Sequence, residues 1–188
     1  AGADKTRVLL AALLLSPHIP LLFMGEEFGE THPFLFFTDF HGDLAKAVRE
    51  GRAKEFTGHA GHDETVPDPN DVNTFIRSKL DWNKIATDEG KTWLRYTRHL
   101  LTLRHRYIVP LLHPGGAVEG HVLKTAPGMV AVSWRFPSGT LSLALNIGTK
   151  PVDLPALAGE TRFAWPELND VLPPNGIVVR FADGEASL

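Results

Sequence analysis

Residues 20–29 read PLLFMGEEFG, and this stretch decides the fold class expected for the chain. Residues 21–24 form a short run that is apolar on both faces, which is typical of a strand buried within a parallel sheet. Gly25 ends the run, and two adjacent carboxylates, Glu26 and Glu27, follow it directly. The carboxyl ends of the strands carry the ligand cleft in α/β barrels. The stretch therefore predicts two acidic side chains at the edge of such a cleft.

The residues before this stretch predict a helix that leads into the strand. Residues 4–15 are rich in alanine and leucine, and Pro17 ends the helix because proline disfavours a helical residue before it. The helix is apolar on nearly every side, so we expect it to be buried nearly all round. Its apolar run is far shorter than the roughly 20 residues of a membrane span, and no signal-peptide pattern surrounds it. A helix, a short connection and a buried strand together form one helix–strand unit of an α/β fold.

An aromatic loop and two further helices are expected after the strand. The loop covers residues 28–41, and a polar helix with Asp43 as its N-cap follows at 44–56. Residues 57–69 predict an exposed loop and residues 70–80 an irregular segment, with a turn beginning at residue 81.

A further helix is expected at residues 89–106, with an apolar face that contains Trp93 and Leu100. We expect its basic side chains on the solvated face, and the proline and glycine residues from Pro110 onward to form a boundary. The basic side chains are those of Arg95, Arg98, Arg104, His105 and Arg106.

The pattern changes to short strands after the glycines at 115 and 116. Strands are expected at 118–124, 129–136, 140–147, 151–154, 162–163 and 176–181. Trp134 alternates with two valines and is expected in the core. The fold class is therefore α/β followed by all-β. Residues 1–114 would be the C-terminal portion of a (β/α)8 barrel, and residues 115–188 an antiparallel β-sandwich.

Composition excludes several classes of partner. The chain has 188 residues, a net charge of -3 and no cysteine. That charge gives no electrostatic reason to expect nucleic acid or an acidic membrane as partner. The missing cysteines exclude disulfides and thiolate metal sites, and they suit a cytoplasmic protein. A cluster of histidine and acidic residues at 59–64 lies in a glycine-rich loop that cannot preorganise ligands, so we expect no metal.

Residues 16–29 resemble the eighth-strand region of the α-amylase-type glycoside hydrolases. Within that superfamily, residues 33–40 (PFLFFTDF) and 44–52 (LAKAVREGR) resemble the malto-oligosyltrehalose trehalohydrolase family. The stretches 66–69, 74–75 and 78–82 are similar to the same family, as is the following helix with Leu100, Leu103 and Arg104. The likeness spans roughly residues 8–112. Beyond residue 117 the likeness is one of architecture alone.

The resemblance implies a retaining α-glycosidase that cuts the α-1,4 bond next to a terminal trehalose unit. In the family, the two carboxyl groups of this reaction and a third Asp lie on the fourth, fifth and seventh barrel strands. The resemblance of this chain starts after the seventh strand, so no catalytic residue is expected in it. Alone it should be inactive. Its partners would be a malto-oligosaccharide or α-glucan and the remainder of the barrel, from the same protein or a companion chain, and no cofactor is implied. A branching or debranching enzyme, or a non-catalytic glucan-binding module, remains the alternative.

The candidate substrate-binding residues are Glu26, Glu27, Phe36, Phe37 and Asp39. Carboxylates hydrogen-bond sugar hydroxyls, and phenylalanine rings stack on the C–H faces of pyranoses. Each residue type also has a structural role: the glutamates can tie the loop to its own barrel, the phenylalanines can pack it, and the aspartate can cap it.

Overall fold

The computed structural model describes residues 2–56, 66–113, 118–167 and 170–184. It divides into two compact units, one made of Ala1–Leu22 with Arg95–Leu188 and the other of Phe23–Leu94. Each unit is described by itself below. The expected division of the chain at residues 114 and 115 stays a prediction.

The first unit is built on an antiparallel sheet. Its five strands lie in the order β1-β2-β3-β7-β5, and β4 pairs with β6 in a second, two-stranded sheet. Every pairing is antiparallel among the described residues, which confirms the expected character of this region. The strands are β1 Glu119–Ala126, β2 Met129–Phe136, β3 Gly139–Asn146, β4 Val152–Asp153, β5 Glu160–Trp165, β6 Val171–Leu172 and β7 Gly176–Asp183. The sequence did not predict β6, because two residues carry no alternating pattern.

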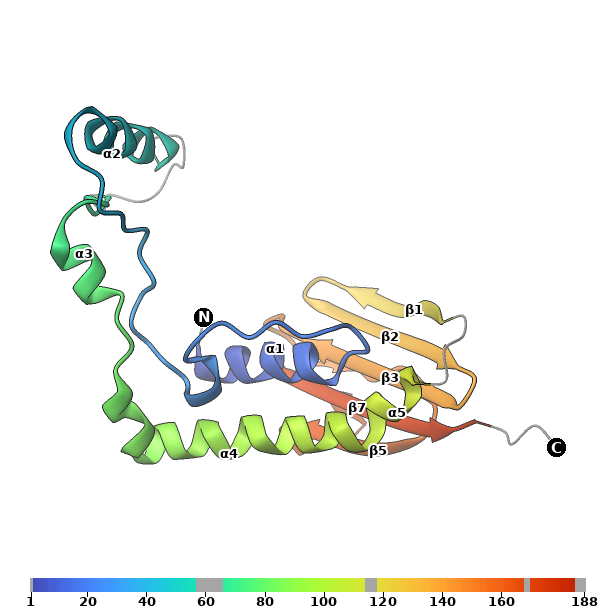
Figure 1. Cartoon of the computed structure of the whole chain (residues 1–188). Helices are drawn as coiled ribbons and strands as arrows, with labels where there is room; N and C mark the ends of the chain where they lie inside the picture. Colours follow the sequence, from blue (N-terminus) through green and yellow to red (C-terminus); the bar gives the residue numbers. More distant parts are fainter. Residues whose placement is uncertain (1, 57–65, 114–117, 168–169, 185–188) are drawn as a thin grey trace. The chain divides into compact units, whose positions relative to one another are not determined.

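Both faces of the five-stranded sheet are covered at its central strands, whereas the edge strand β1 is largely exposed. One face packs on the β4-β6 side through a core that includes Ala131, Ala144, Leu172 and Val178. Helix α1, Ala3–Leu15, and the later part of α4, Asp88–Leu103, lie over the other face (Figure 1). The sheet is thus the middle of a layered structure, and its apolar residues on alternate positions are buried on both sides.

Helix α1 confirms the helix expected at residues 4–15, but it is not buried all round. Val8, Leu10, Ala11, Leu14 and Leu15 are buried. Leu9 is 43% exposed because the sheet covers only one side of the helix. The expectation of burial nearly all round is therefore wrong for the described residues, since Asp4 and Thr6 are exposed as well.

The second long helix runs past its expected end. Helix α4 is followed without a break by a π-helical turn, η3, at Arg104–Ile108 and by α5, Val109–Leu112. The N–H of Val109 donates to the carbonyl of Arg104, five residues earlier. This wider turn directly precedes Pro110, which lies at the start of α5. The missing N–H and the bulky ring of a proline would disrupt an ordinary α-helical turn.

Arg104 is buried, so its expected place on a solvated face is wrong. Its guanidinium donates to the carbonyls of Leu14, Ser16 and His18 at 2.7–2.9 Å. Burial lowers the pKa of Arg104 because desolvation disfavours the charged form. A pattern of basic residues along one helix does not reveal that a neighbouring helix ends beside it.

The second unit carries short helices joined by extended segments. They are η1 Glu26–Phe28, α2 Gly42–Phe56, α3 Val72–Arg77, η2 Trp82–Ala86 and the start of α4. Asp43 lies in the first turn of α2 rather than at its N-cap. The segment expected to be irregular contains α3, whose N-cap Asp71 accepts a hydrogen bond from the N–H of Asn73.

Residues 21–24 do not form the expected strand. They lie in an irregular segment that ends in a turn at Met24 and Gly25. Leu21 is 88% exposed and Ile19 is 93% exposed. The physical reason is that a strand inside a sheet needs hydrogen-bonding neighbours on both sides, and the described residues supply none for this segment.

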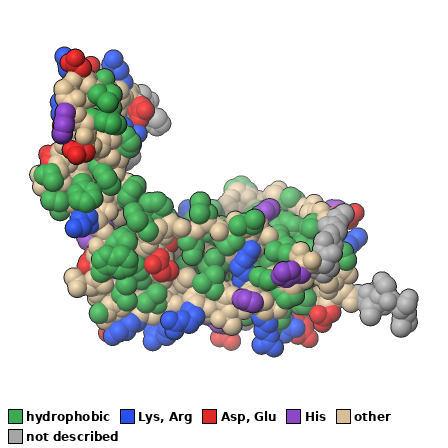
Figure 2. All heavy atoms as spheres, viewed as in Figure 1, with side chains coloured by type: hydrophobic (Ala, Val, Ile, Leu, Met, Phe, Trp, Pro, Cys, Tyr) green, Lys and Arg blue, Asp and Glu red, His purple; other side chains and the backbone are tan. Residues whose placement is uncertain are grey.

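Exposed apolar side chains are numerous in the second unit. Phe34, Phe36, Phe75 and Ile76 are each about half exposed. Figure 2 shows hydrophobic side chains gathered over the segment that carries α3 and the loop before α2. Among the described residues, no helix combines the length and the apolar character that crossing a membrane requires.

Candidate substrate-binding site

The two glutamates that follow the apolar run bind the backbone of their own loop. They begin η1, directly after Gly25, whose φ of 91° is in the left-handed region. The carboxylate of Glu26 accepts from the N–H of Phe23 at 2.9 Å, and that of Glu27 accepts from the N–H of Gly25 at 3.0 Å. These hydrogen bonds fix the turn, which is the structural role that the sequence left open.

A third carboxylate, Glu30, organises this region, and sequence reasoning missed it. Its side chain is only 6% exposed. It accepts three backbone hydrogen bonds, from Thr31 at 2.6 Å, His32 at 2.8 Å and Asp81 at 2.6 Å. Burial acts to raise the pKa of Glu30, but the three N–H donors outweigh it and the pKa lies below its ordinary value. Glu30 therefore joins the loop to the start of η2 as an ionised carboxylate.

Tight packing behind the loop requires glycine at residue 29. Gly29 has a φ of 71°, and a Cβ there would lie 2.5 Å from Cδ1 of Trp93. Phe28 is fully buried, with its ring 5.9 Å from that of Trp82. The loop that carries the glutamates is thus anchored on α4 and η2. The GEEFG pattern contained this signal, since a glycine after an apolar residue often marks a close approach.

Phe36 and Phe37 have different surroundings, as expected for neighbours on extended backbone. The Phe37 ring makes edge contacts with Phe34 at 5.7 Å and Phe75 at 5.2 Å, and Phe34 contacts Phe23 at 5.0 Å. These four rings form an aromatic cluster. The Phe36 ring is 47% exposed, with the guanidinium of Arg52 4.9 Å from its centroid.

Asp39 lies between two residues that Asn70 holds. The Asn70 side-chain oxygen accepts from the Thr38 hydroxyl at 2.9 Å and from the N–H of Phe40 at 3.1 Å. The Asp39 side chain is exposed, and no hydrogen bond or ion pair joins it to another described residue. The backbone around it is therefore fixed while its carboxylate retains its capacity to bind a hydroxyl group.

The structure brings together some of the five candidate residues. Glu26 binds the backbone of Phe23, and the ring of Phe23 belongs to the same cluster as Phe37. Phe36 and Asp39 remain available to solvent on the same loop. This combination of aromatic surface and carboxylate can bind a polyhydroxylated ligand, but it holds no paired acid and nucleophile among the described contacts.

No metal-binding group of three or more His, Cys, Asp or Glu side chains occurs within the described ranges. The histidine and acidic cluster at 59–64, considered above as a metal site, lies outside the described residues.

The comparisons with solved structures identify the class of protein. A crystal structure of a Salmonella typhimurium protein described as an α-amylase matches 97% of this chain at 64% identity, with a TM-score of 0.91. The trehalulose synthase MutB of Pseudomonas mesoacidophila MX-45 matches 95% of the chain at 17% identity and a TM-score of 0.58, which shows a shared fold. The chain covers 31% and 38% of those two chains. The mixed helical and antiparallel fold is thus that of α-amylase-type glycoside hydrolases.

Curated relatives narrow the class to one family. The malto-oligosyltrehalose trehalohydrolase of Brevibacterium helvolum is 36% identical over 158 residues, 83% of this chain. That of Deinococcus radiodurans is 48% identical over 104 residues, 55% of the chain. The chain spans 26% and 17% of the lengths of these two relatives. No protein-family model matches. The resemblance seen in the sequence is confirmed, and the chain belongs to the malto-oligosyltrehalose trehalohydrolase family of glycoside hydrolases.

Proposed function

We propose that this chain is part of a retaining α-glycosidase that hydrolyses the α-1,4 bond next to the terminal trehalose of malto-oligosyltrehalose and releases trehalose. The observation that carries the proposal is the 36% identity over 158 residues to a malto-oligosyltrehalose trehalohydrolase. Retaining hydrolysis needs an acid/base and a nucleophile about 5 Å apart. In the proposal, that pair belongs to the remainder of the catalytic barrel, and this chain contributes to substrate binding.

The segment of residues 19–24 is the proposed contact with the remainder of the barrel. Ile19 and Leu21 are 93% and 88% exposed on backbone that has no strand partner among the described residues. Apolar side chains on unpaired backbone are favourable only when a neighbouring strand covers them. Residues 1–114 would then be the C-terminal segment of a (β/α)8 barrel, completed by the same protein or by a companion chain.

The loop of residues 23–41 is the proposed sugar-contacting surface. Phe36 and Asp39 are proposed to touch an α-glucan, because both are exposed, whereas the carboxylate of the exposed Glu26 already binds the N–H of Phe23. Glu26, Glu27 and Phe37 would position the loop, since the two carboxylates accept from the N–H groups of Phe23 and Gly25 and the Phe37 ring contacts Phe34 and Phe75. Exposed aromatic surface beside a carboxylate suits a sugar ring.

A chimeric enzyme tests the proposal. The aligned 158 residues of the Brevibacterium helvolum relative are replaced by the matching segment of this chain. Free trehalose is then measured after incubation with malto-oligosyltrehalose. We expect the chimera to release trehalose and this chain alone to release none.

Three outcomes would contradict the proposal. Trehalose release by this chain alone would contradict the absence of catalytic carboxylates. New branch points or cleaved branches from an α-glucan, without trehalose, would favour a branching or debranching enzyme. A correctly folded chimera that binds glucan without turnover would favour a non-catalytic glucan-binding module. Circular dichroism of the chimera distinguishes this result from misfolding.

A further inference from the structure

A cavity lies within the first unit and is lined by residues of that unit alone. Its volume is about 330 Å³, and it opens between η3, the turn before β3 and the ends of β5 and β7. This volume falls at the lower end of the roughly 300–1,000 Å³ of small-molecule sites. Its principal lining residues are Arg106, Tyr107, Ser138, Arg162, Phe181 and Asp183.

The polar groups of the cavity have unused hydrogen-bonding capacity. Arg162 places one nitrogen, Nη2, 2.8 Å from the carboxylate of Glu160. Its Nε is buried and has no hydrogen-bond partner in the part of the chain that the structure describes. The side chains of Arg106, Ser138 and Asp183 likewise have no hydrogen-bond partner among the described residues. Arg106, Ser138 and Asp183 are exposed, so these side chains can exchange bound water for a ligand, and the buried Nε of Arg162 is the unsatisfied donor beside them.

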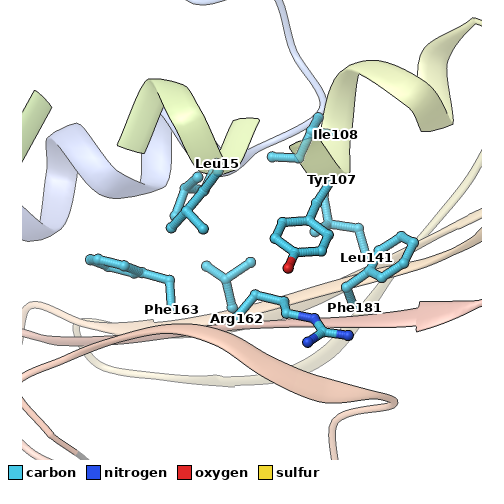
Figure 3. A pocket seen from close by; sticks show the side chains of 9 residues that line it. Leu15, Tyr107, Ile108, Leu141, Arg162, Phe163 and Phe181 are labelled. Atoms are coloured by element: carbon cyan, nitrogen blue, oxygen red, sulfur yellow. The ribbon is translucent and has the colours of Figure 1, made fainter. Parts of the chain in front are cut away.

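Aromatic side chains form another part of the wall. Figure 3, which shows a neighbouring apolar pocket that shares Tyr107, Arg162 and Phe181 with this cavity, has Tyr107 directed from η3 toward the strands, with Arg162 and the ring of Phe181 beside it. The Tyr107 and Phe181 rings are 5.7 Å apart, and the guanidiniums of Arg106 and Arg162 lie 5.3 Å and 5.0 Å from the Tyr107 centroid. The π-helical turn places Arg106 and Tyr107 at this position. The site thus combines planar charged groups with partly exposed rings.

The charges of the site select the class of ligand. Arg106 and Arg162 carry positive charge, and Asp183 and Glu160 carry negative charge, so the four groups balance. An anion would be attracted by the arginines but repelled by the carboxylates, and the reverse holds for a cation. A neutral ligand rich in hydroxyl groups can donate to the carboxylate of Asp183 and accept from both guanidiniums. Its C–H surface can also pack against the rings.

We propose that this cavity binds a sugar ring of an α-1,4-linked gluco-oligosaccharide, through residues that include none of the candidate residues of the loop 23–41. The choice of this neutral polyol rests on the proposed function, since an enzyme acting on such glucans meets them at high local concentration. The site itself depends on the cavity residues alone. Its role is to hold a glucan while the chemistry proceeds elsewhere in the complete enzyme.

Titration of the full chain with maltotriose, followed by NMR, tests the site. We expect saturable shifts and about tenfold weaker binding in Arg106→Gln and in Asp183→Asn, since each change removes one charged hydrogen-bonding group. Both side chains lie at the surface, so the variants should fold. Arg98→Gln, an exposed arginine on α4 outside the cavity, is the matched control and should bind normally.

Four results would overturn the inference. Two of them are a failure to bind maltotriose and the binding of inorganic phosphate in place of the sugar. The other two results are binding that both cavity variants leave unchanged and equal weakening in the Arg98→Gln control. The chimeric enzyme distinguishes a failure of this inference from a failure of the proposed function. Maltotriose binding at the cavity without trehalose release by a folded chimera would contradict only the proposed function. Trehalose release without cavity binding would contradict only this inference.

Discussion

The guanidinium of Arg104, in η3, donates a hydrogen bond of 2.9 Å to the carbonyl of Leu14, near the end of α1. Two residues separated by 90 positions are thereby joined, and the same guanidinium also reaches the carbonyls of Ser16 and His18. The last carbonyls of a helix have no partner within it, and a cation there interacts favourably with the helix dipole. Arg104 therefore fixes how α1 ends and where the chain turns toward residue 19.

Arg104→Gln should destabilise the first unit by about 2–3 kcal/mol, because it removes charged hydrogen bonds and leaves buried carbonyls unsatisfied. Urea unfolding measures the change. Arg98→Gln, at an exposed position on the same helix, should change the free energy of unfolding by less than about 0.5 kcal/mol. Equal effects of the two substitutions would contradict the capping role of Arg104.

Glu30→Gln should remove a pH-dependent contribution to stability. The pKa of Glu30 is lowered in the folded state, so the carboxylate stabilises the fold fully above its ordinary pKa of 4.5 and loses this effect as the pH falls. We expect the variant to be about 1–3 kcal/mol less stable near neutral pH, with the difference shrinking in acid. Glu50→Gln, at an exposed position on α2, is the control. A difference that stays constant down to pH 2 would contradict the prediction.

Gly29→Ala should be more damaging than Gly42→Ala. Both glycines have positive φ, at 71° and 59°, so an alanine costs roughly 1–2 kcal/mol at either position. Only at Gly29 would the new Cβ also collide with Trp93, which adds overpacking of about 1–3 kcal/mol. Thermal unfolding of the two variants compares them directly. Equal losses would mean that Trp93 can move aside.

Phe37→Ala and Phe36→Ala should separate packing from ligand contact. Phe37 contacts Phe34 and Phe75, so its truncation should lower the free energy of unfolding by about 2 kcal/mol. Phe36 is about half exposed, and its truncation should cost less than about 1 kcal/mol. Denaturant melts of both variants measure this difference, and a larger loss at Phe36 would reverse the assignment.

Asp39→Asn in the chimeric enzyme should raise KM for malto-oligosyltrehalose about tenfold, because a carboxylate binds a hydroxyl group more strongly than an amide does. Stability should not change, since the side chain has no hydrogen-bond or ion-pair partner among the described residues. Asp43→Asn, in the first turn of α2, should leave KM unchanged. An unaltered KM in the Asp39 variant would remove this residue from the substrate contacts.

Local patterns in the sequence determined much of the first unit. The alternation of residues 129–136 predicted β2 with its observed bounds, because a strand has a side-chain period of two. The alanine and leucine content of residues 4–15 similarly predicted α1. The family could also be inferred, since its motifs are specific combinations of residues that need no coordinates.

Tertiary structure alone decided the properties that depend on distant residues. Leu21 has the apolar character of a buried strand, yet whether it pairs depends on neighbouring strands, and the described residues offer none. The sequence alone indicates an exposed cation at Arg104, but the end of α1 lies beside it and buries it. The role of Glu30 depends on the N–H of Asp81, a residue distant in the sequence. Sequence periodicity reports which face of an element is apolar, whereas burial and hydrogen bonding depend on which other element lies against that face.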